Sequence, residues 1–193
     1  MYENKKGLKT SHYVGTTGLY IGTFDPFTKG HESIVSQALN IFDNVAIIIV
    51  DNPLKGIPVF TQYDRLNMIA KIYRDIPNIF QAECRTHSEI ADMFKIFNSN
   101  SVIRGIRNES DYTYEVKVKR FYENLYEVGL NFVYFLADIK HQHISSSLAK
   151  ERILSGECAS EFLNESISDF AEREIRLFYG KEKSYEKETK KET

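Results

Sequence analysis

The chain has 193 residues, a formal net charge of −2 and 27% charged residues, so it lacks the broad basic field that nucleic-acid binding favours. No apolar run approaches the roughly 20 residues of a membrane-spanning helix, and the first residues lack the apolar centre of a secretory leader. The two cysteines, Cys84 and Cys158, are far apart and show no metal-ligand spacing. We therefore expect a cytoplasmic protein with no nucleic-acid or membrane partner and no disulfide framework.

The elements follow one another as alternating strands and helices. We expect a flexible extension over 1–16, a single domain over 17–180 and a charged, disordered tail over 181–193. Strands are predicted over 18–21, 44–50, 79–83, 101–104 and 131–137. Helices are predicted over a segment that includes 34–42, and over 61–74, 88–97, 111–126, 146–154 and 160–179, the last ending at Gly180.

This alternation predicts an α/β fold with a doubly wound parallel sheet. The run 44–50 is continuously β-branched and apolar, which is typical of a strand buried on both faces. Right-handed crossovers place the carboxyl ends of all parallel strands at one edge of the sheet. The turn at Gly22, the loop from Asp51, the turn at Arg104 and the loop after Ala137 should therefore converge on one site.

The run 22–31, Gly-Thr-Phe-Asp-Pro-Phe-Thr-Lys-Gly-His, connects the first strand to the first helix. Such a turn offers free backbone N–H groups and a positive helix end, which suit an anion. Gly22 and Gly30 omit side chains where a phosphate would approach the backbone, and His31 falls in the first helical turn. The alternative is an ordinary strand-to-helix turn with a solvated histidine.

Cationic side chains occur in two of the other converging loops. Lys55 lies in the loop 51–60, where it is either a mobile charge for a phosphate or a solvated lysine. Arg104 and Arg107 stand at a strand end, where an unpaired buried guanidinium would be too costly. They either bind phosphate oxygens or bridge acids such as Glu109 or Asp111.

Three serines open a predicted helix further along the chain. Ser145, Ser146 and Ser147 bring hydroxyl groups and free backbone N–H groups together, which favours a phosphate. The alternative is that these serines only cap the helix.

These stretches together resemble one family. The run 22–31 resembles the T/HxGH signature of the nucleotidyltransferase superfamily, and its threonine is typical of phosphopantetheine adenylyltransferase. Residues 104–107 and 111–115 resemble that family's arginine–glycine–x–arginine and tyrosine–glutamate pattern. Residues 141–151, with the Ile-Ser-Ser-Ser run, resemble its second signature, and the resemblance covers roughly residues 18–165.

The resemblance implies a Rossmann-like fold and an enzyme of coenzyme A biosynthesis. Such an enzyme transfers an adenylyl group from ATP to 4′-phosphopantetheine, giving dephospho-coenzyme A and pyrophosphate. The acceptor supplies its own phosphate oxygen as the nucleophile, so catalysis rests on in-line positioning and charge stabilisation. The resemblance also implies Mg²⁺ as the cofactor that shields the phosphates, and a homo-oligomer, specifically a hexamer.

Site residues carry over position by position. The resemblance implies three catalytic residues: His31, which would stabilise the pentavalent transition state, and Lys55 and Arg104, which would hold the acceptor phosphate. The implied ATP-binding residues, of which Arg107 and the three serines hold the departing pyrophosphate, are Thr23, Phe24, His31, Gly105, Arg107, Glu115, His141, Ser145, Ser146 and Ser147. The implied acceptor-binding residues are Thr23, Lys55, Ile90 and Arg104, and no residue is assigned to a metal.

Several positions depart from the family pattern. The loop with Lys55 is one residue longer than usual, and Ile21 and Asn164 stand where the family has proline. Tyr122 occupies an asparagine position that contacts the pantetheine arm, and His141 stands where an aromatic residue is usual. Two other functions stay open: a nicotinate or nicotinamide mononucleotide adenylyltransferase, and a nucleotide-binding regulator that has lost turnover. The first usually has histidine at the position of Thr28 and a threonine in the second motif.

Overall fold

The computed structural model describes residues 14–52, 55–126 and 129–189. Its strands are β1 (Thr17–Gly22), β2 (Asn44–Val50), β3 (Ile79–Cys84), β4 (Ser101–Ile106) and β5 (Asn131–Leu136). Its α-helices are α1 (Lys29–Ala38), α2 (Gln62–Ile72), α3 (Ile90–Ile96), α4 (Glu109–Leu125), α5 (Ser146–Ser155) and α6 (Glu165–Thr189). Short 3-10 helices are η2 (His87–Glu89), η3 (Ile139–His141) and η4 (Ala159–Glu161).

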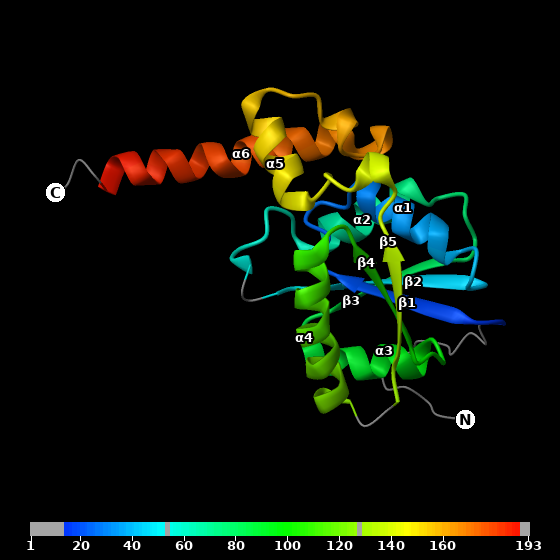
Figure 1. Cartoon of the computed structure of the whole chain (residues 1–193). Coiled ribbons are helices and arrows are strands. Elements are labelled where there is room, and N and C mark those ends of the chain that lie inside the picture. The colour runs from blue at the N-terminus through cyan, green and yellow to red at the C-terminus, as the bar shows by residue number, and fades with distance from the viewer. Residues whose placement is uncertain (1–13, 53–54, 127–128, 190–193) are drawn as a thin grey trace.

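The five strands form one parallel sheet in the order β3-β2-β1-β4-β5 (Figure 1). The chain builds outward from β1 to β3, then crosses back to place β4 on the other side of β1. Leu19 of β1 is accordingly in register with Ala46 of β2 on one side and with Val102 of β4 on the other. The predicted doubly wound sheet is confirmed, and its strand order reverses between β1 and β4, where such folds bind ligands.

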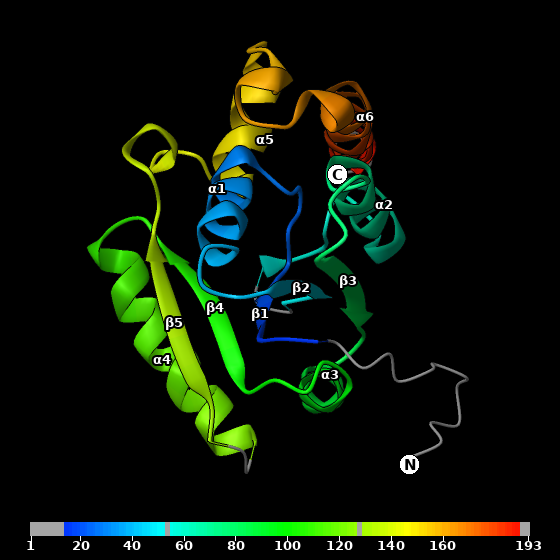
Figure 2. The same ribbon diagram turned by 90° about the vertical axis from the view of Figure 1, so that its right-hand side faces the viewer.

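Helices cover both faces of the sheet (Figure 2). Helices α1 and α2 pack on one face, where Ile34 and Ile69 meet Ile47 and Ile103 of the strands. Helices α3 and α4 cover the other face. Every residue of β2 is buried, which confirms the prediction of a strand enclosed on both sides.

A third apolar cluster joins α5 and α6 to α2. Ile153 of α5 and Ile167 of α6 are buried with Met68 of α2. The backbone N–H of Lys29 donates to the carbonyl of Phe162 at 2.9 Å, which ties the start of α1 to the same unit. These contacts hold the N-terminus of α5 beside the carboxyl ends of the strands.

Two predicted boundaries are wrong in the last third of the chain. The helix expected from 160 begins only at Glu165, because the Asn164 side chain accepts the N–H of Ser166 at 3.0 Å and caps α6 there. It also continues to Thr189, past Gly180, where we predicted its end. The lysine- and glutamate-rich composition of this stretch favours helix, and one glycine costs only about 1 kcal/mol.

The predicted N-terminal extension falls largely outside the described residues. Within the described part, Thr16 donates its N–H and its hydroxyl to Asp43 Oδ2 at 2.7 and 3.0 Å. Among the residues that the structure describes, no helix is long and apolar enough to cross a membrane.

The buried centre of β2 predicts a stability test. Ile47 is fully buried, so Ile47→Ala should lower the free energy of unfolding by about 2–5 kcal/mol, and Ile47→Val by about 0.5–1.5 kcal/mol. Ile57 is 84% exposed and provides the control, because Ile57→Ala should change stability by less than about 0.5 kcal/mol. Urea denaturation measures all three. Equal losses for the two alanine variants would contradict the core position of Ile47.

Candidate active site

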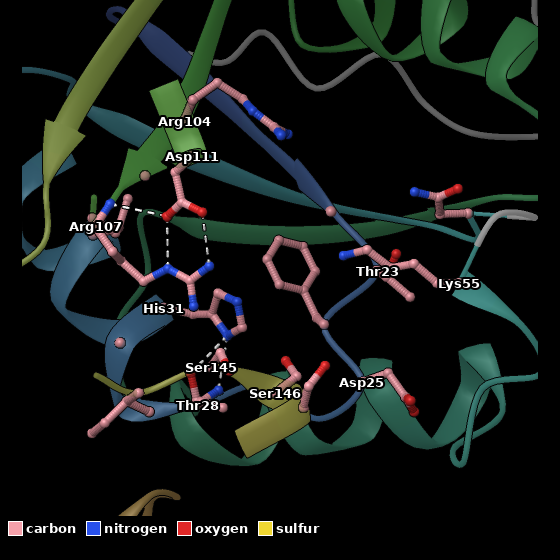
Figure 3. Close-up of a pocket in the computed structure, with 18 of the residues that line it drawn as sticks. Thr23, Asp25, Thr28, His31, Lys55, Arg104, Arg107, Asp111, Ser145 and Ser146 are labelled. Carbon is pink, nitrogen blue, oxygen red and sulfur yellow. Dashed lines mark hydrogen bonds and ion pairs between the residues drawn. The ribbon is translucent and has the colours of Figure 1, made fainter. Parts of the chain in front are cut away.

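A cavity of about 540 Å³ lies at the carboxyl ends of the strands. The four segments that the sequence predicted to converge all contribute to it. Most of the expected site residues line it: Thr23, Phe24, His31, Lys55, Arg104, Gly105, Arg107, Glu115, Ser145, Ser146 and Ser147. Figure 3 shows side chains from the turn after β1, from α1, from β4 and from α5 around this common space.

The turn after β1 has an unusual backbone. Phe24 has φ +52°, in the left-handed region, and its ring packs edge-on against Tyr20 and His31 at centroid distances of 5.0 and 5.1 Å. A Cβ at Gly22 would come within 2.9 Å of this ring, so the fold leaves no room for a side chain there. The glycine thus lets Phe24 fold back over the turn and support His31.

Gly30 allows α1 and α5 to approach closely. A Cβ at this position would lie 3.2 Å from the carbonyl oxygen of Ile144, just before the serine run. The hydroxyl of Ser146 donates to the carbonyl of Pro26 at 2.8 Å and joins the two segments. The N-termini of α1 and α5 therefore both lie at the cavity, where the positive ends of the two helix dipoles favour an anion.

His31 is held in one protonation form. Its Nδ1 accepts the backbone N–H of Thr28 at 2.9 Å, so the single proton of the neutral ring resides on Nε2. Burial, together with the charges of Arg107 and Lys55, lowers the pKa of His31 to about 3. The neutral ring thus offers an Nε2–H donor to the cavity without adding a charge.

Arg104 is anchored inside the protein. Its Nε and Nη2 donate to the two oxygens of Glu115 at 2.6 and 2.5 Å, and its Nη1 donates to the carbonyl of Ile21 at 2.8 Å. Burial disfavours the charge of Arg104, but the hydrogen bonds and charge of Glu115 raise its pKa. The guanidinium is therefore a fixed cation at the end of β4.

Arg107 also has a carboxylate partner. Its Nε and Nη2 donate to Asp111 Oδ2 and Oδ1 at 2.8 and 3.1 Å, and its backbone N–H donates to Oδ2 at 3.1 Å (Figure 3). Both arginines thus bridge acids in this structure, as one of the two alternatives proposed. Arg107 pairs with Asp111, which we named as a candidate, whereas Arg104 pairs with Glu115 and not with Glu109. Both arginines nevertheless line the cavity.

Lys55 reaches the cavity from the loop between β2 and α2. The residue as a whole is exposed, and its backbone N–H donates to the carbonyl of Asn52 at 2.9 Å. Partial burial and the nearby charges of Arg104, Arg107 and Lys150 lower its pKa, whereas Glu115 opposes this change. Lys55 thus belongs to a cluster of four cations around one space.

The three serines have different roles. Ser145 caps α5, because its hydroxyl oxygen accepts the N–H of Leu148 at 3.1 Å. Ser146 is engaged with Pro26, as described above, and Ser147 is exposed. The alternative that a serine caps the helix is therefore confirmed for Ser145. This cap leaves the first N–H groups of α5 directed at the cavity.

Two expected binding residues are not among those that line the cavity. Ile90 begins α3 and is fully buried in the apolar cluster between the sheet and the helices α3 and α4. His141 ends η3, where its Nδ1 lies 3.9 Å from Asp138 Oδ2. Burial and the charge of Lys140 lower the pKa of His141, and Asp138 opposes this shift.

The cavity is also lined by an ion pair between Asp25 and Lys150, which the sequence analysis did not predict. Asp25 accepts the N–H groups of Val59 and Phe60 at 3.2 and 3.0 Å and the ammonium of Lys150 at 2.8 Å. It therefore connects the turn after β1 with the end of the 51–60 loop and with α5. Asp25 lies inside the run 22–31 and Lys150 inside the run 141–151. Their membership of the two signature segments was the only feature of the sequence that could have suggested this pair.

Arg65 of α2 was also missed. This side chain is 1% exposed, and its guanidinium donates to the carbonyl of Thr23 and to Asp51 Oδ1, both at 2.7 Å. Its Nε donates to the carbonyl of Thr61 at 3.3 Å. An arginine in the middle of a helix ordinarily faces solvent, so periodicity carried no signal for this contact.

The chain matches a cytidylyltransferase-like family model over residues 19–152. It is 29% identical over 151 residues to a phosphopantetheine adenylyltransferase of Caldanaerobacter subterraneus subsp. tengcongensis, covering 78% of this chain and 92% of that protein. It is 35% identical over 136 residues to a phosphopantetheine adenylyltransferase of Streptococcus uberis, covering 70% of this chain and 80% of that protein.

A solved structure shares the fold. It is a bifunctional NMN adenylyltransferase/ADP ribose pyrophosphatase from Francisella tularensis, complexed with AMP and a manganese ion. The TM-score is 0.61 at 15% identity, and the match covers 92% of this chain and 55% of that chain. The match supports the Rossmann-like architecture of the nucleotidyltransferases.

The hydrogen bond to Thr28 predicts the titration of His31. Because its pKa is lowered to about 3, the His31 ring should stay neutral, with its proton on Nε2, between about pH 5 and 8. Nitrogen-15 NMR of the imidazoles across this range measures both properties, and the His31→Gln spectrum assigns the signal. An inflection of the His31 signal near pH 6.5 would contradict the burial and hydrogen bonding described here.

Proposed function

Because the chain belongs to the cytidylyltransferase-like family and, within it, to the phosphopantetheine adenylyltransferases, we propose that it transfers the adenylyl group of ATP to 4′-phosphopantetheine. The products are dephospho-coenzyme A and pyrophosphate. One observation carries this proposal: a neutral histidine donor, four cations and two helix N-termini surround a single cavity at the strand ends. This arrangement suits a reaction between two phosphate-bearing substrates.

The chain's residues supply position and electrostatic stabilisation. The attacking oxygen belongs to the acceptor's own phosphate, so no protein nucleophile is required. His31 would donate from Nε2 to the α-phosphate, where negative charge grows in the transition state. Its place on the rigid first turn of α1 means that this donor needs no reorganisation during the reaction.

The cations divide between the two substrates. We assign Lys55 and Arg104 to the acceptor phosphate and Arg107 to the departing pyrophosphate, with the N-terminus of α5 beside it. Support comes from position: Lys55, Arg104 and Arg107 line the same cavity, and the charges of the two arginines lower the pKa of Lys55, so the three lie close enough to share one pair of substrates. Holding two polyanions in line requires this concentration of positive charge.

Mg²⁺ enters this proposal as a companion of ATP. In the part of the chain that the structure describes, no group of three or more histidine, cysteine, aspartate or glutamate side chains could hold a metal ion. The carboxylates at the cavity, Asp25, Asp111 and Glu115, are each engaged by a cation. The ion would therefore take its ligands from phosphate oxygens and water, and it would shield their charge.

The hexamer and the cytoplasmic location remain proposals that rest on the family resemblance and on composition. No observation in the structure favours a mononucleotide acceptor.

An adenylyl-transfer assay with ATP and a panel of 4′-phosphopantetheine, nicotinate mononucleotide and nicotinamide mononucleotide tests the function. Turnover with 4′-phosphopantetheine alone is expected. Turnover only with a mononucleotide, or none with any acceptor, would overturn the proposal.

His31→Ala should lower kcat by about 10²–10³, because it removes one donor to the developing charge. The KM for ATP should change little, since the donor acts mainly in the transition state. His143 is exposed, and His143→Ala provides a control that should keep normal turnover. Steady-state kinetics measure both variants. A His31→Ala enzyme with nearly normal kcat would remove His31 from the catalytic assignment.

Lys55→Ala should weaken acceptor binding more than ATP binding, by about tenfold, because a charge-assisted contact to the acceptor phosphate is lost. Pantetheine, which lacks that phosphate, should bind weakly and be nearly indifferent to the change. Isothermal titration with each ligand measures these affinities, and Lys95→Ala at an 80% exposed side chain is the control. Equal losses for ATP and acceptor would show that Lys55 has been assigned the wrong partner.

A further inference from the structure

We propose that Asp111 is a displaceable carboxylate: it pairs with Arg107 until phosphate oxygens take its place, and it thereby sets the affinity of the site for ATP and pyrophosphate. The inference rests on the proposed function, because it takes Arg107 as a phosphate-binding residue. Arg107 then has two successive partners: it forms an ion pair with Asp111 in the empty site, and it binds phosphate when the ligand is present.

Three carboxylates at the cavity partner cations, and two of them are fixed. Glu115 is buried, with a side chain that is 6% exposed, and both its oxygens are taken by Arg104. Asp25 is 8% exposed and is held by two backbone N–H groups as well as by Lys150. Moving either one would leave buried donors or charges without partners, which is costly.

Asp111 has weaker constraints. Its side chain is 22% exposed, and all three of its hydrogen bonds come from Arg107. It lies in the first turn of α4, four residues after its partner. Partly exposed pairs of this kind add little stability, so turning Asp111 toward solvent costs less than moving Glu115 or Asp25, although it also releases the backbone N–H of Arg107.

Phosphate binding at the side-on fork of Arg107 requires this movement. Nε and Nη2, the two donors of that fork, already point at Asp111. Phosphate oxygens that take this fork must replace the carboxylate, since two anions cannot share it. A triphosphate or a pyrophosphate carries more negative charge than one carboxylate, so it displaces Asp111 from Arg107.

Asp111 accordingly weakens phosphate binding and favours product release. When pyrophosphate leaves, the carboxylate returns to Arg107, so the guanidinium exchanges one anion for another. Burial disfavours the charge of Asp111, but the hydrogen bonds and charge of Arg107 lower its pKa, so the competitor is ionised at neutral pH.

The test is isothermal titration of the full chain with inorganic pyrophosphate. Asp111→Asn keeps the shape and an acceptor oxygen but removes the charge, and it should bind pyrophosphate about threefold to tenfold more tightly than the wild type. Glu109→Gln is the matched control, because it removes a charge from the same helical turn without touching Arg107. It should change the affinity by less than about twofold.

A double-mutant cycle separates displacement from simple repulsion. In an Arg107→Ala background, Asp111→Asn should lose most of its gain, because no guanidinium remains to be released. An equal gain in both backgrounds would overturn the proposal in favour of general repulsion, and weaker binding by Asp111→Asn would show that Asp111 only positions Arg107. Pyrophosphate is common to all adenylyl transfers, so this result is independent of which acceptor the turnover assay identifies.

Discussion

The site depends on one buried cation, the guanidinium of Arg65. The Arg65 side chain is 1% exposed, and a buried charge of this kind is stable only when its donors have partners. These partners are Asp51 and the carbonyl of Thr23. These contacts fix the end of β2 to the turn after β1. On the other side of the turn, Asp25 accepts hydrogen bonds from the end of the 51–60 loop and from Lys150 of α5. The strained backbone at Phe24 is thus clamped from both sides, which preorganises the donor on His31.

The electrostatics of the cavity combine fixed and exchangeable parts. Arg104 is locked by Glu115, and His31 stays neutral because its ring is desolvated among cations. Such a site binds polyanions through groups already in place, and only the partner of Arg107 has the exposure to move. Rigid charge favours the transition state, whereas a movable carboxylate moderates the affinity for substrates and products.

The sequence predicted those features that depend on period and chain order. Local pattern and topology predicted the β-branched run of β2. They also predicted the convergence of the turn at Gly22, the loop from Asp51, the turn at Arg104 and the loop after Ala137. Contacts that depend on tertiary geometry did not. A mid-helix arginine such as Arg65 has the sequence pattern of a surface residue, and periodicity cannot say whether Arg107 faces an acid or a ligand. The start of α6 was missed because Asn164 acts through its side chain as a cap.

The order of the strands also constrains how the protein can be made by a ribosome. Tyr20 of β1 pairs with Ile103 of β4, so the central strand keeps an open edge until the second half of the chain has been synthesised. The site needs still more, because Lys150 of α5 must reach Asp25. A nascent chain therefore cannot bind nucleotide early in translation as a means of stabilising itself. During that interval its exposed β1 edge is a surface that chaperones could protect.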